Sequence, residues 1–339
     1  MKALQANLVI QAGRIFCKDT GLDGPGAVAI NGDRILSSGQ QIPTSSVETL
    51  DFHDCLLLPG FVDMHAHPAP YTWKYGMNAD RDVLPNGTTT VLSQGDAGAA
   101  TWDQYRTEII KPSRTRIRLA ISPALQGESE DRTLFENLDD IDIDECVAAV
   151  VDGGDSIWGI AVNLSPSVTG TTSPHEVMRR TLAIAELTDK PLLFGARVED
   201  PEWSLADQFA LLRAGDVVTY CFRASTQNIV SGDRVIDSAW EARERGVLFD
   251  VGHGMRSFDF SIAETAIANG FPPDTISTDF YKRHVGLVPL HDMPRTLSKL
   301  IASGMEETEA LERATYRPAA ALNLDGEIGS LAPGKCADL

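Results

Sequence analysis

Two histidines separated by one residue form the pattern in the sequence that most directly suggests chemistry. An apolar run at 56–58 and a Pro-Gly break lead into a short stretch that ends in His65-Ala66-His67. Side chains two residues apart on a β-strand point to the same face, so both imidazoles can reach one space at the strand's end. Neutral imidazole is the commonest protein ligand for metal ions. The spacing indicates a metal site, and a pair that only caps a strand is the alternative.

The elements that would position this pair alternate between strands and helices. After a strand at 59–67, runs of apolar and β-branched residues predict strands over 87–93, 117–121, 158–163, 191–196, 216–222, 247–251 and 275–279. Helical periodicity lies between them, for example over 174–188 and 294–303. Strands of this kind alternating with helices predict a parallel sheet covered on both faces. Eight units predict a (β/α)₈ TIM barrel over residues 59–325, with an open, doubly wound sheet as the alternative.

The chain before the barrel has a different pattern. Short strands are predicted at 7–10, 14–16, 27–30, 34–36, 49–52 and 55–58, and Asn31-Gly32-Asp33 is typical of a tight hairpin turn. No helical period of useful length occurs in this segment. We therefore expect residues 1–58 to form a small β domain.

Active sites of (β/α)₈ barrels lie at the carboxyl ends of the strands, so the residues there are the candidates for chemistry. Asp279 ends the eighth strand, which neighbours the first strand in a closed barrel. Its carboxylate can bind a metal ion or act as the base toward a metal-activated water. His253 ends the seventh strand, where it can act as a general acid, hydrogen-bond a substrate, or only orient its loop.

The segment 59–67, Pro-Gly-Phe-Val-Asp-Met-His-Ala-His, resembles the first barrel strand of the amidohydrolase superfamily. More narrowly, nearly the whole chain is similar to the dihydroorotase-like branch of deacetylases and adenine-deaminase-like proteins. The resemblance implies a metal-dependent hydrolase that cleaves an amide, cyclic amide or ester bond of a small substrate. It also implies that Asp279 serves as both metal ligand and base, and that His253 lies beside the substrate.

The last residues also match this family. The segment 326–339, Gly-Glu-Ile-Gly-Ser-Leu-Ala-Pro-Gly-Lys-Cys-Ala-Asp-Leu, resembles the stretch that returns the chain to the small β domain. The resemblance therefore implies a β-sandwich-type domain made of residues 1–58 and 326–339. We expect this domain to be short of strands and to leave an exposed edge, which further chain or another subunit would cover. A homo-oligomer is compatible with this expectation.

Three metal ligands of the resembled family are replaced in this chain. Ala161 stands where the family has a lysine that is usually carboxylated, and Gly195 and Tyr220 stand where it has histidines. Ala161 cannot supply a bridging anion, and the two histidines that would hold a second ion are missing. We therefore expect at most one ion, zinc, with a metal-free site as the alternative; the expected ligands are His65, His67 and Asp279.

The replacements change the predicted substrate pocket. If the strands stay regular, the barrel mouth would be lined by Asn163, Arg197, Tyr220 and Arg223. Guanidinium groups match a carboxylate bidentately, so this set predicts binding of an anionic substrate group. In the alternative, Arg197 only pairs with Glu199 or Asp200. Tyr220 can donate a proton or hydrogen-bond an oxyanion, or it only fills the space left by histidine.

The composition of the chain limits the binding partners and the cellular compartment that can be expected for it. A net charge of −19 makes nucleic acids and anionic membranes unfavourable partners, which leaves a small-molecule substrate. No run approaches the roughly 18 apolar residues of a membrane span. Five scattered cysteines indicate a reducing compartment, and the N-terminus lacks an apolar signal core, so a cytoplasmic protein is expected.

Two further function classes compete with the metal-dependent hydrolase. One is a metal-independent lyase or isomerase on the same barrel, in which the histidines and Asp279 transfer protons. The other is a catalytically inactive binding protein of the same fold. Metal content separates the first class from these two, and a ligand screen by thermal shift separates the remaining pair.

Overall fold

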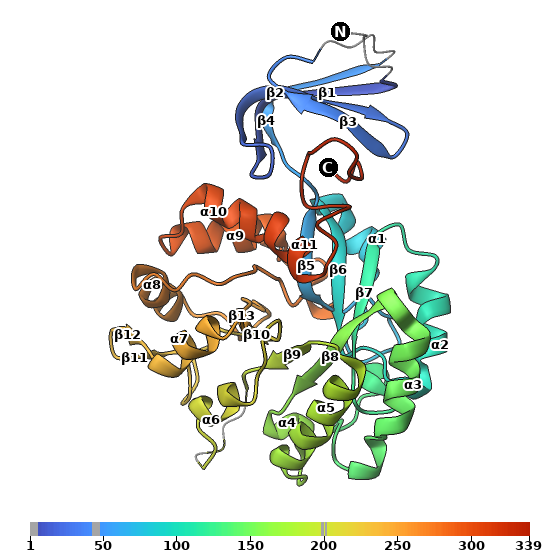
Figure 1. Ribbon diagram of the computed structural model, residues 1–339, viewed down its shortest axis with the longest axis vertical. Helices are drawn as coiled ribbons and strands as arrows, with labels where there is room; N and C mark the ends of the chain where they lie inside the picture. Colours follow the sequence, from blue (N-terminus) through green and yellow to red (C-terminus); the bar gives the residue numbers. More distant parts are fainter. Residues whose placement is uncertain (1–5, 43–47, 198–199, 201) are drawn as a thin grey trace.

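Four strands from the N-terminal part of the chain form a small sheet at one end of the molecule (Figure 1). The computed structural model describes residues 6–42, 48–197, 200 and 202–339. The strands are β1 (Leu8–Cys17), β2 (Leu22–Asn31), β3 (Arg34–Gly39) and β4 (Thr49–Leu57), in the order β3-β2-β1-β4. Only Gly32 and Asp33 separate β2 from β3, which confirms the predicted hairpin turn.

The small sheet differs from the prediction in how its strands are divided. The predicted strands at 7–10 and 14–16 are one strand, β1, with irregular pairing to β2 between Ala12 and Ile15. Gly13 lies within this irregular part, where a Cβ atom would come 1.9 Å from the carbonyl oxygen of His53. A residue with a side chain cannot occupy that position, and glycine lets β1 continue past it.

Seven parallel strands form the larger sheet, in the order β13-β10-β9-β8-β7-β6-β5. Their buried, largely apolar residues are typical of strands covered on both faces. Each corresponds to one of the predicted barrel strands; they are β5 (Phe61–Ala66), β6 (Thr88–Gln94), β7 (Arg116–Ile121), β8 (Ile157–Asn163), β9 (Leu192–Gly195), β10 (Val217–Thr219) and β13 (Leu248–Phe249). The hairpin of β11 (Val230–Ser231) and β12 (Arg234–Val235) is an addition that was not predicted.

The predicted eighth strand, 275–279, is present as an extended segment that makes isolated bridges. Thr275 pairs with Asp250 just beyond β13, and Phe280 pairs with Ala66 of β5, both in parallel. The segment thus links the two edges of the seven-stranded sheet. It is irregular because Ile276 donates its N–H to the carbonyl of Arg313 rather than to a neighbouring strand, and because Asp279 has a φ of +49°.

Helices pack on the outer faces of the strands (Figure 1). The predicted helix at 174–188 is confirmed at α5 (Pro174–Thr188), where proline at the first turn fits the missing N–H. The helix predicted at 294–303 is α9 (Met293–Ala302), which begins one residue earlier because Asp292 caps it. The other helices are α1 (Ala79–Asp82), α2 (Trp102–Tyr105), α3 (Ile143–Gly153), α4 (Pro166–Thr169), α6 (Leu205–Ala210), α7 (Asp237–Glu244), α8 (Phe260–Ala268), α10 (Glu307–Arg313) and α11 (Tyr316–Ala321).

Short 3₁₀ and π turns complete the connections; they are η1 (Leu84–Asn86), η2 (Ala99–Thr101), η3 (Arg106–Ile110), η4 (Gly127–Ser129), η5 (Leu138–Asp140), η6 (Gly154–Ser156) and η7 (Lys282–His284). Within the described residues, we find no helix that is long and apolar enough to cross a membrane.

The C-terminal tail connects the small sheet to the barrel strands. Ile35 of β3 exchanges backbone hydrogen bonds with Lys335 and Gly334, and Gly60 donates its N–H to the carbonyl of Asp338. Leu331 is fully buried in the core of the small sheet. On the other side of this sheet, β4 pairs only with β1 among the described strands, and residues 49–55 are exposed.

Candidate metal centre

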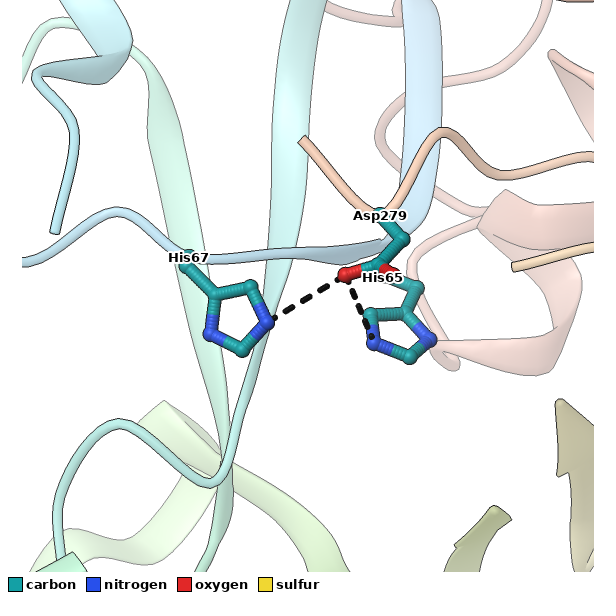
Figure 2. A group of neighbouring side chains, drawn as sticks. All are labelled: His65, His67 and Asp279. Carbon is teal, nitrogen blue, oxygen red and sulfur yellow. Dashed lines mark ion pairs between the residues drawn. The ribbon is translucent and has the colours of Figure 1, made fainter. Parts of the chain in front are cut away.

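Three side chains, two from the end of β5 and one from the segment 275–280 beside it, converge on one point (Figure 2). Nε2 of His65 lies 3.5 Å from Oδ1 of Asp279, and Nε2 of His67 lies 3.3 Å from the same oxygen. All three residues are buried, with 0%, 3% and 7% of their surfaces exposed. The structure therefore brings together the three residues that the sequence predicted as ligands.

The backbone between β5 and the segment 275–280 fixes this arrangement. Asp279 donates its N–H to the carbonyl of His65 at 2.7 Å, and His67 donates to the carbonyl of Phe280 at 2.9 Å. Pairing of β5 with β6 is irregular between Asp63 and Ala66, at the point where the histidines begin. These contacts hold the two imidazoles on either side of the Asp279 carboxylate.

A chain of hydrogen bonds behind His65 determines where its proton sits. The hydroxyl of Thr219 donates to Oδ2 of Asp250 at 2.8 Å, so it can only accept from Nδ1 of His65, which lies 2.9 Å away. Asp250 also accepts from the hydroxyls of Thr275 and Ser277. Burial lowers the pKa of His65 to about 4, so the ring is neutral and carries its proton on Nδ1. Its Nε2 lone pair therefore faces the centre of the site.

His67 is held by acidic groups on its outer side. Its Nδ1 lies 2.9 Å from Oδ1 of Asp96, whose other oxygen accepts from the hydroxyl of Ser93 at 2.5 Å. Glu128 approaches the same nitrogen to 3.5 Å. Burial by itself would lower the pKa of His67, but the carboxylates of Asp96, Asp279 and Glu128 outweigh burial and raise it well above 6.5.

The donor set fits a single cation. Nε2 of His65 and Oδ1 of Asp279 are both acceptors, and they face each other at 3.5 Å without a proton between them. In the metal-free site these atoms are met by the hydroxyl of Tyr220 and by the proton of His67, and one cation bound between them would take the place of both. Each imidazole also uses its outer nitrogen for a hydrogen bond, to Thr219 or to Asp96, which is how metal-binding histidines are usually oriented.

Arg197 lies beside this centre, just beyond β9. The carbon of its guanidinium is 5.0 Å from the centroid of the Tyr220 ring, and its Nε is buried without a hydrogen-bond partner among the described residues. Of the two acids that could pair with it, Glu199 lies outside the described residues. Asp200 uses one carboxylate oxygen to accept the N–H of Glu202.

Asn163 and Arg223 stand at the ends of β8 and β10. The side-chain oxygen of Asn163 accepts the N–H of Ser165 at 3.1 Å, which tightens the loop after β8. The N–H of Arg223 donates to the carbonyl of Tyr220 at 3.1 Å and closes the turn after β10. Both residues lie at the same end of the strands as the histidines.

His253 lies on the other side of Asp279, with both of its ring nitrogens engaged. Nδ1 lies 2.7 Å from the carbonyl oxygen of Gly254, and Nε2 lies 2.7 Å from Nζ of Lys299. Burial and the nearby Lys299 lower the pKa of His253 to about 3. The neutral ring therefore donates to Gly254 and accepts from Lys299.

Comparisons with known proteins agree with this geometry. Residues 259–339 match the model of the amidohydrolase family. A deacetylase of Agrobacterium fabrum is 30% identical over 317 residues, which cover 90% of this chain and 74% of that protein. The chain belongs to the amidohydrolase superfamily. Within the superfamily, it falls in the branch that contains deacetylases and dihydroorotases.

Solved structures extend the similarity to the whole fold. The crystal structure of a dihydroorotase superposes with a TM-score of 0.87 at 27% identity, covering 98% of this chain and 87% of that one. The crystal structure of an adenine deaminase gives a TM-score of 0.88 at 27% identity, with 98% and 89% covered. The α/β barrel architecture predicted from the sequence is therefore that of an amidohydrolase.

In this amidohydrolase, the positions that resemble the remaining family ligands are filled differently. Ala161 of β8 belongs to the apolar cluster that also contains Leu92 of β6 and Leu193 of β9. A Cβ atom at Gly195 would lie 3.1 Å from the Tyr220 ring, so the absence of a side chain there makes room for the tyrosine. Among the described residues, a second group of acidic and histidine ligands exists, but it shares one of its members with the first and consists of His67, Asp96 and Glu128.

Several residues around this amidohydrolase site were not found from the sequence. Asp96, Thr219 and Asp250 hold the two histidines, and Lys299 holds His253. Asp250 stands at the end of a predicted strand, and this position could have marked it as a candidate site residue. Thr219 and Asp96 carry no comparable signal, because serine, threonine and aspartate are common near strand ends for reasons of turn geometry.

Two tyrosines cover the centre from the loop side. The ring of Tyr75 lies 5.0 Å from that of His67, and the ring of Tyr281 lies 5.5 Å from that of Tyr75. Lys282 anchors the two loops to each other, since its N–H donates to the carbonyl of Tyr75 at 3.0 Å. This tyrosine cover, Tyr75 and Tyr281, explains how the three converging side chains are so fully buried.

Proposed function

We propose that the protein is a deacetylase-like hydrolase that uses one divalent ion, zinc, to cleave an amide, cyclic amide or ester bond of a small molecule. The convergence of His65 Nε2 and His67 Nε2 on Asp279 Oδ1 carries this proposal. Two imidazoles and one carboxylate form a ligand set known for catalytic zinc. The names of the relatives, deacetylase, dihydroorotase and adenine deaminase, support a hydrolytic reaction.

Asp279 is proposed to be the base as well as a ligand. A bound divalent ion would acidify a water molecule and polarise the carbonyl of the substrate. Although burial alone would raise the pKa of Asp279, the neighbouring His65 and His67 keep it below its usual range, so the carboxylate is ionised at neutral pH. It can therefore accept the proton of the attacking water and return that proton to the leaving atom.

The substrate is proposed to carry an anionic group, such as a carboxylate. Arg197 supports this proposal, because its buried Nε–H has no acceptor among the described residues and lies beside the metal ligands. Asn163 and Arg223 stand around the same end of the barrel and complete the proposed pocket. His253 is assigned a positioning role, because both of its ring nitrogens already have partners.

The domain organisation is also a proposal. We propose a catalytic barrel at 59–325 and a β-sandwich-type domain formed by residues 1–58 with 326–339. The hydrogen bonds of Ile35 with Gly334 and Lys335 support this division, because they attach the tail to β3.

Metal analysis of the purified protein, combined with a substrate panel, tests the proposed function. Protein purified without added metal, or reconstituted with Zn²⁺, should hold about one ion per chain, as expected for one three-ligand site. It should hydrolyse members of a panel of N-acetyl, O-acetyl and cyclic amide compounds that carry a carboxylate. Two ions per chain, or activity that survives complete chelation, would contradict the proposal.

A further inference from the structure

The hydroxyl of Tyr220 points at the proposed metal position. Its oxygen lies 3.3 Å from Nε2 of His65, the nitrogen that faces Asp279. Because His65 carries its proton on Nδ1, its Nε2 is an acceptor, and the Tyr220 hydroxyl donates to it. An ion bound to that nitrogen would replace this hydrogen bond and leave the tyrosine oxygen next to a cation.

Three distances between successive donor atoms match the edge length of a small coordination polyhedron. A tetrahedral zinc ion with ligands at about 2.0–2.1 Å separates its ligand atoms by about 3.3–3.4 Å. Here the separations are 3.3 Å from Tyr220 Oη to His65 Nε2, 3.5 Å from His65 Nε2 to Asp279 Oδ1, and 3.3 Å from Asp279 Oδ1 to His67 Nε2. The Tyr220 oxygen therefore lies as far from His65 Nε2 as the other ligand atoms lie from one another, which is the spacing expected of a further ligand atom.

The backbone at Tyr220 is held in an unfavourable conformation that serves this placement. Tyr220 has a φ of +66°, and only four residues other than glycine have a positive φ within the described residues. Asp279, one of the proposed ligands, is another of the four. A left-handed conformation is unfavourable for a bulky residue and persists where the surroundings impose it, commonly at functional sites.

The ring of Tyr220 is fixed on two sides. Gly195 lies against it, and a Cβ atom there would approach Cε2 of the ring to 3.1 Å. The guanidinium of Arg197 lies 5.0 Å from the ring centroid. Burial raises the pKa of the Tyr220 hydroxyl well above 10, while Arg197 acts in the opposite direction, so the metal-free phenol is neutral.

We infer that Tyr220 is a fourth protein ligand of the metal ion and binds it as a phenolate, so that the water of the proposed reaction takes a fifth position, an expansion that catalytic zinc sites allow. This replaces the role in proton donation or oxyanion binding that the sequence suggested for it, and it rests on the proposed metal site. On coordination, the O–H bond of Tyr220 breaks, the phenolate oxygen binds the ion, and the proton is released to solvent. A bound cation favours such deprotonation, as it does for coordinating thiols.

Copper substitution tests the inference through a signal that does not depend on activity. Cu²⁺ binds nitrogen and oxygen sites more tightly than Zn²⁺ does, and copper phenolates absorb visible light by charge transfer. One equivalent of Cu²⁺ should give this band in the wild type and in Tyr75→Phe, which alters another tyrosine that packs on the site. The band should be lost in Tyr220→Phe, which should also weaken Zn²⁺ binding by about 100-fold, the upper end expected even for groups that only support a ligand.

The outcomes separate this inference from the proposed function. Bound Cu²⁺ without the band in the wild type, or the same band in Tyr220→Phe, would overturn the assignment of Tyr220 and leave the zinc hydrolase standing. Failure of the wild type to bind Zn²⁺ or Cu²⁺ would instead refute the proposed metal site. If Tyr220→Phe does not fold, a near-ultraviolet difference spectrum of the wild type on Zn²⁺ addition decides: a phenolate signal supports the inference, and its absence at full occupancy refutes it.

Discussion

The two sides of the barrel mouth differ in how completely they are equipped for metal binding. On the side of β5 and the segment 275–280, His65, His67 and Asp279 converge, and each histidine is held from behind by a buried polar partner. On the side of β8 and β9, the inward positions carry Ala161 and Gly195, which have no donor atoms. The ligands for one ion therefore lie together with the groups that orient them, while the space beside Gly195 is filled by the ring of Tyr220.

Removing a metal ligand on the side of β5 and the segment 275–280 should have the largest effect on metal binding and turnover. His67→Ala removes one imidazole and leaves Asp279 without one of its two partners, so metal binding and turnover should both be abolished. Metal content by mass spectrometry and turnover of a hydrolysed substrate measure the result. His175→Ala, an exposed histidine of α5, should change neither quantity. Full zinc occupancy in His67→Ala would show that the two sides do not differ as described.

Removing a supporting group should have a smaller effect than removing a ligand. Asp96→Asn keeps the shape of the side chain but removes the charge that accepts from Nδ1 of His67 at 2.9 Å. The affinity for Zn²⁺ should fall about 10- to 100-fold, as for other residues that orient metal-binding histidines. Competition with a fluorescent zinc chelator measures it. Asp103→Asn, an exposed carboxylate paired with Arg106, is the matched control, and an equal loss there would argue against a supporting role for Asp96.

The pH dependence of Zn²⁺ binding should reveal the proton that His67 carries in the metal-free protein. Although burial opposes it, the carboxylates of Asp96, Asp279 and Glu128 raise the pKa of His67, so the metal-free protein keeps a proton on this ring at neutral pH. Zinc must displace that proton. The proton of His67 should therefore make the affinity rise by about tenfold per pH unit until the pH passes the pKa of His67, and the proton that Tyr220 releases as a phenolate ligand should add about a further tenfold per unit. In Tyr220→Phe, where only the proton of His67 can be released, calorimetric titrations at several pH values would show a flat profile if His67 were neutral throughout.

Substitutions on the side of β8 and β9 should have the smallest effect on the affinity for Zn²⁺. The side-chain oxygen of Asn163 accepts the N–H of Ser165 in the loop after β8 and is not among the converging atoms. Asn163→Ala should change the Kd for Zn²⁺ by less than about threefold, which is under about 0.7 kcal/mol. Its effect should instead appear in KM for a carboxylate-bearing substrate. A zinc affinity as low as that of Asp96→Asn would remove the distinction between the two sides.

Much of the fold could be predicted because it depends on local patterns. The apolar runs of β6 to β9 and the period of α5 are properties of short segments, and they lie where the sequence indicated. The segment 275–279 was predicted as a regular strand, but the N–H of Ile276 donates to the carbonyl of Arg313 in α10 and Asp279 has a positive φ, which no periodicity expresses. The strand ends are correspondingly less regular than predicted.

The candidate site was predictable in part for the same reason. His65 and His67 are neighbours in sequence, and Asp279 follows from the order of strands in a closed barrel. The partners behind them depend on contacts between distant segments, as in the bond from Thr219 to Asp250, 31 residues apart. The aim of the Tyr220 hydroxyl depends on a positive φ at that residue, which the sequence gives no reason to expect in a tyrosine.

The tyrosine cover over the metal centre makes exchange with the surroundings a matter of time as well as affinity. With His65, His67 and Asp279 almost completely buried, an ion can enter or leave only when the loops carrying Tyr75 and Tyr281 separate. Such loop opening takes place over microseconds to seconds. The rate at which a chelator removes the ion would then be limited by this opening and would not rise with the concentration of the chelator.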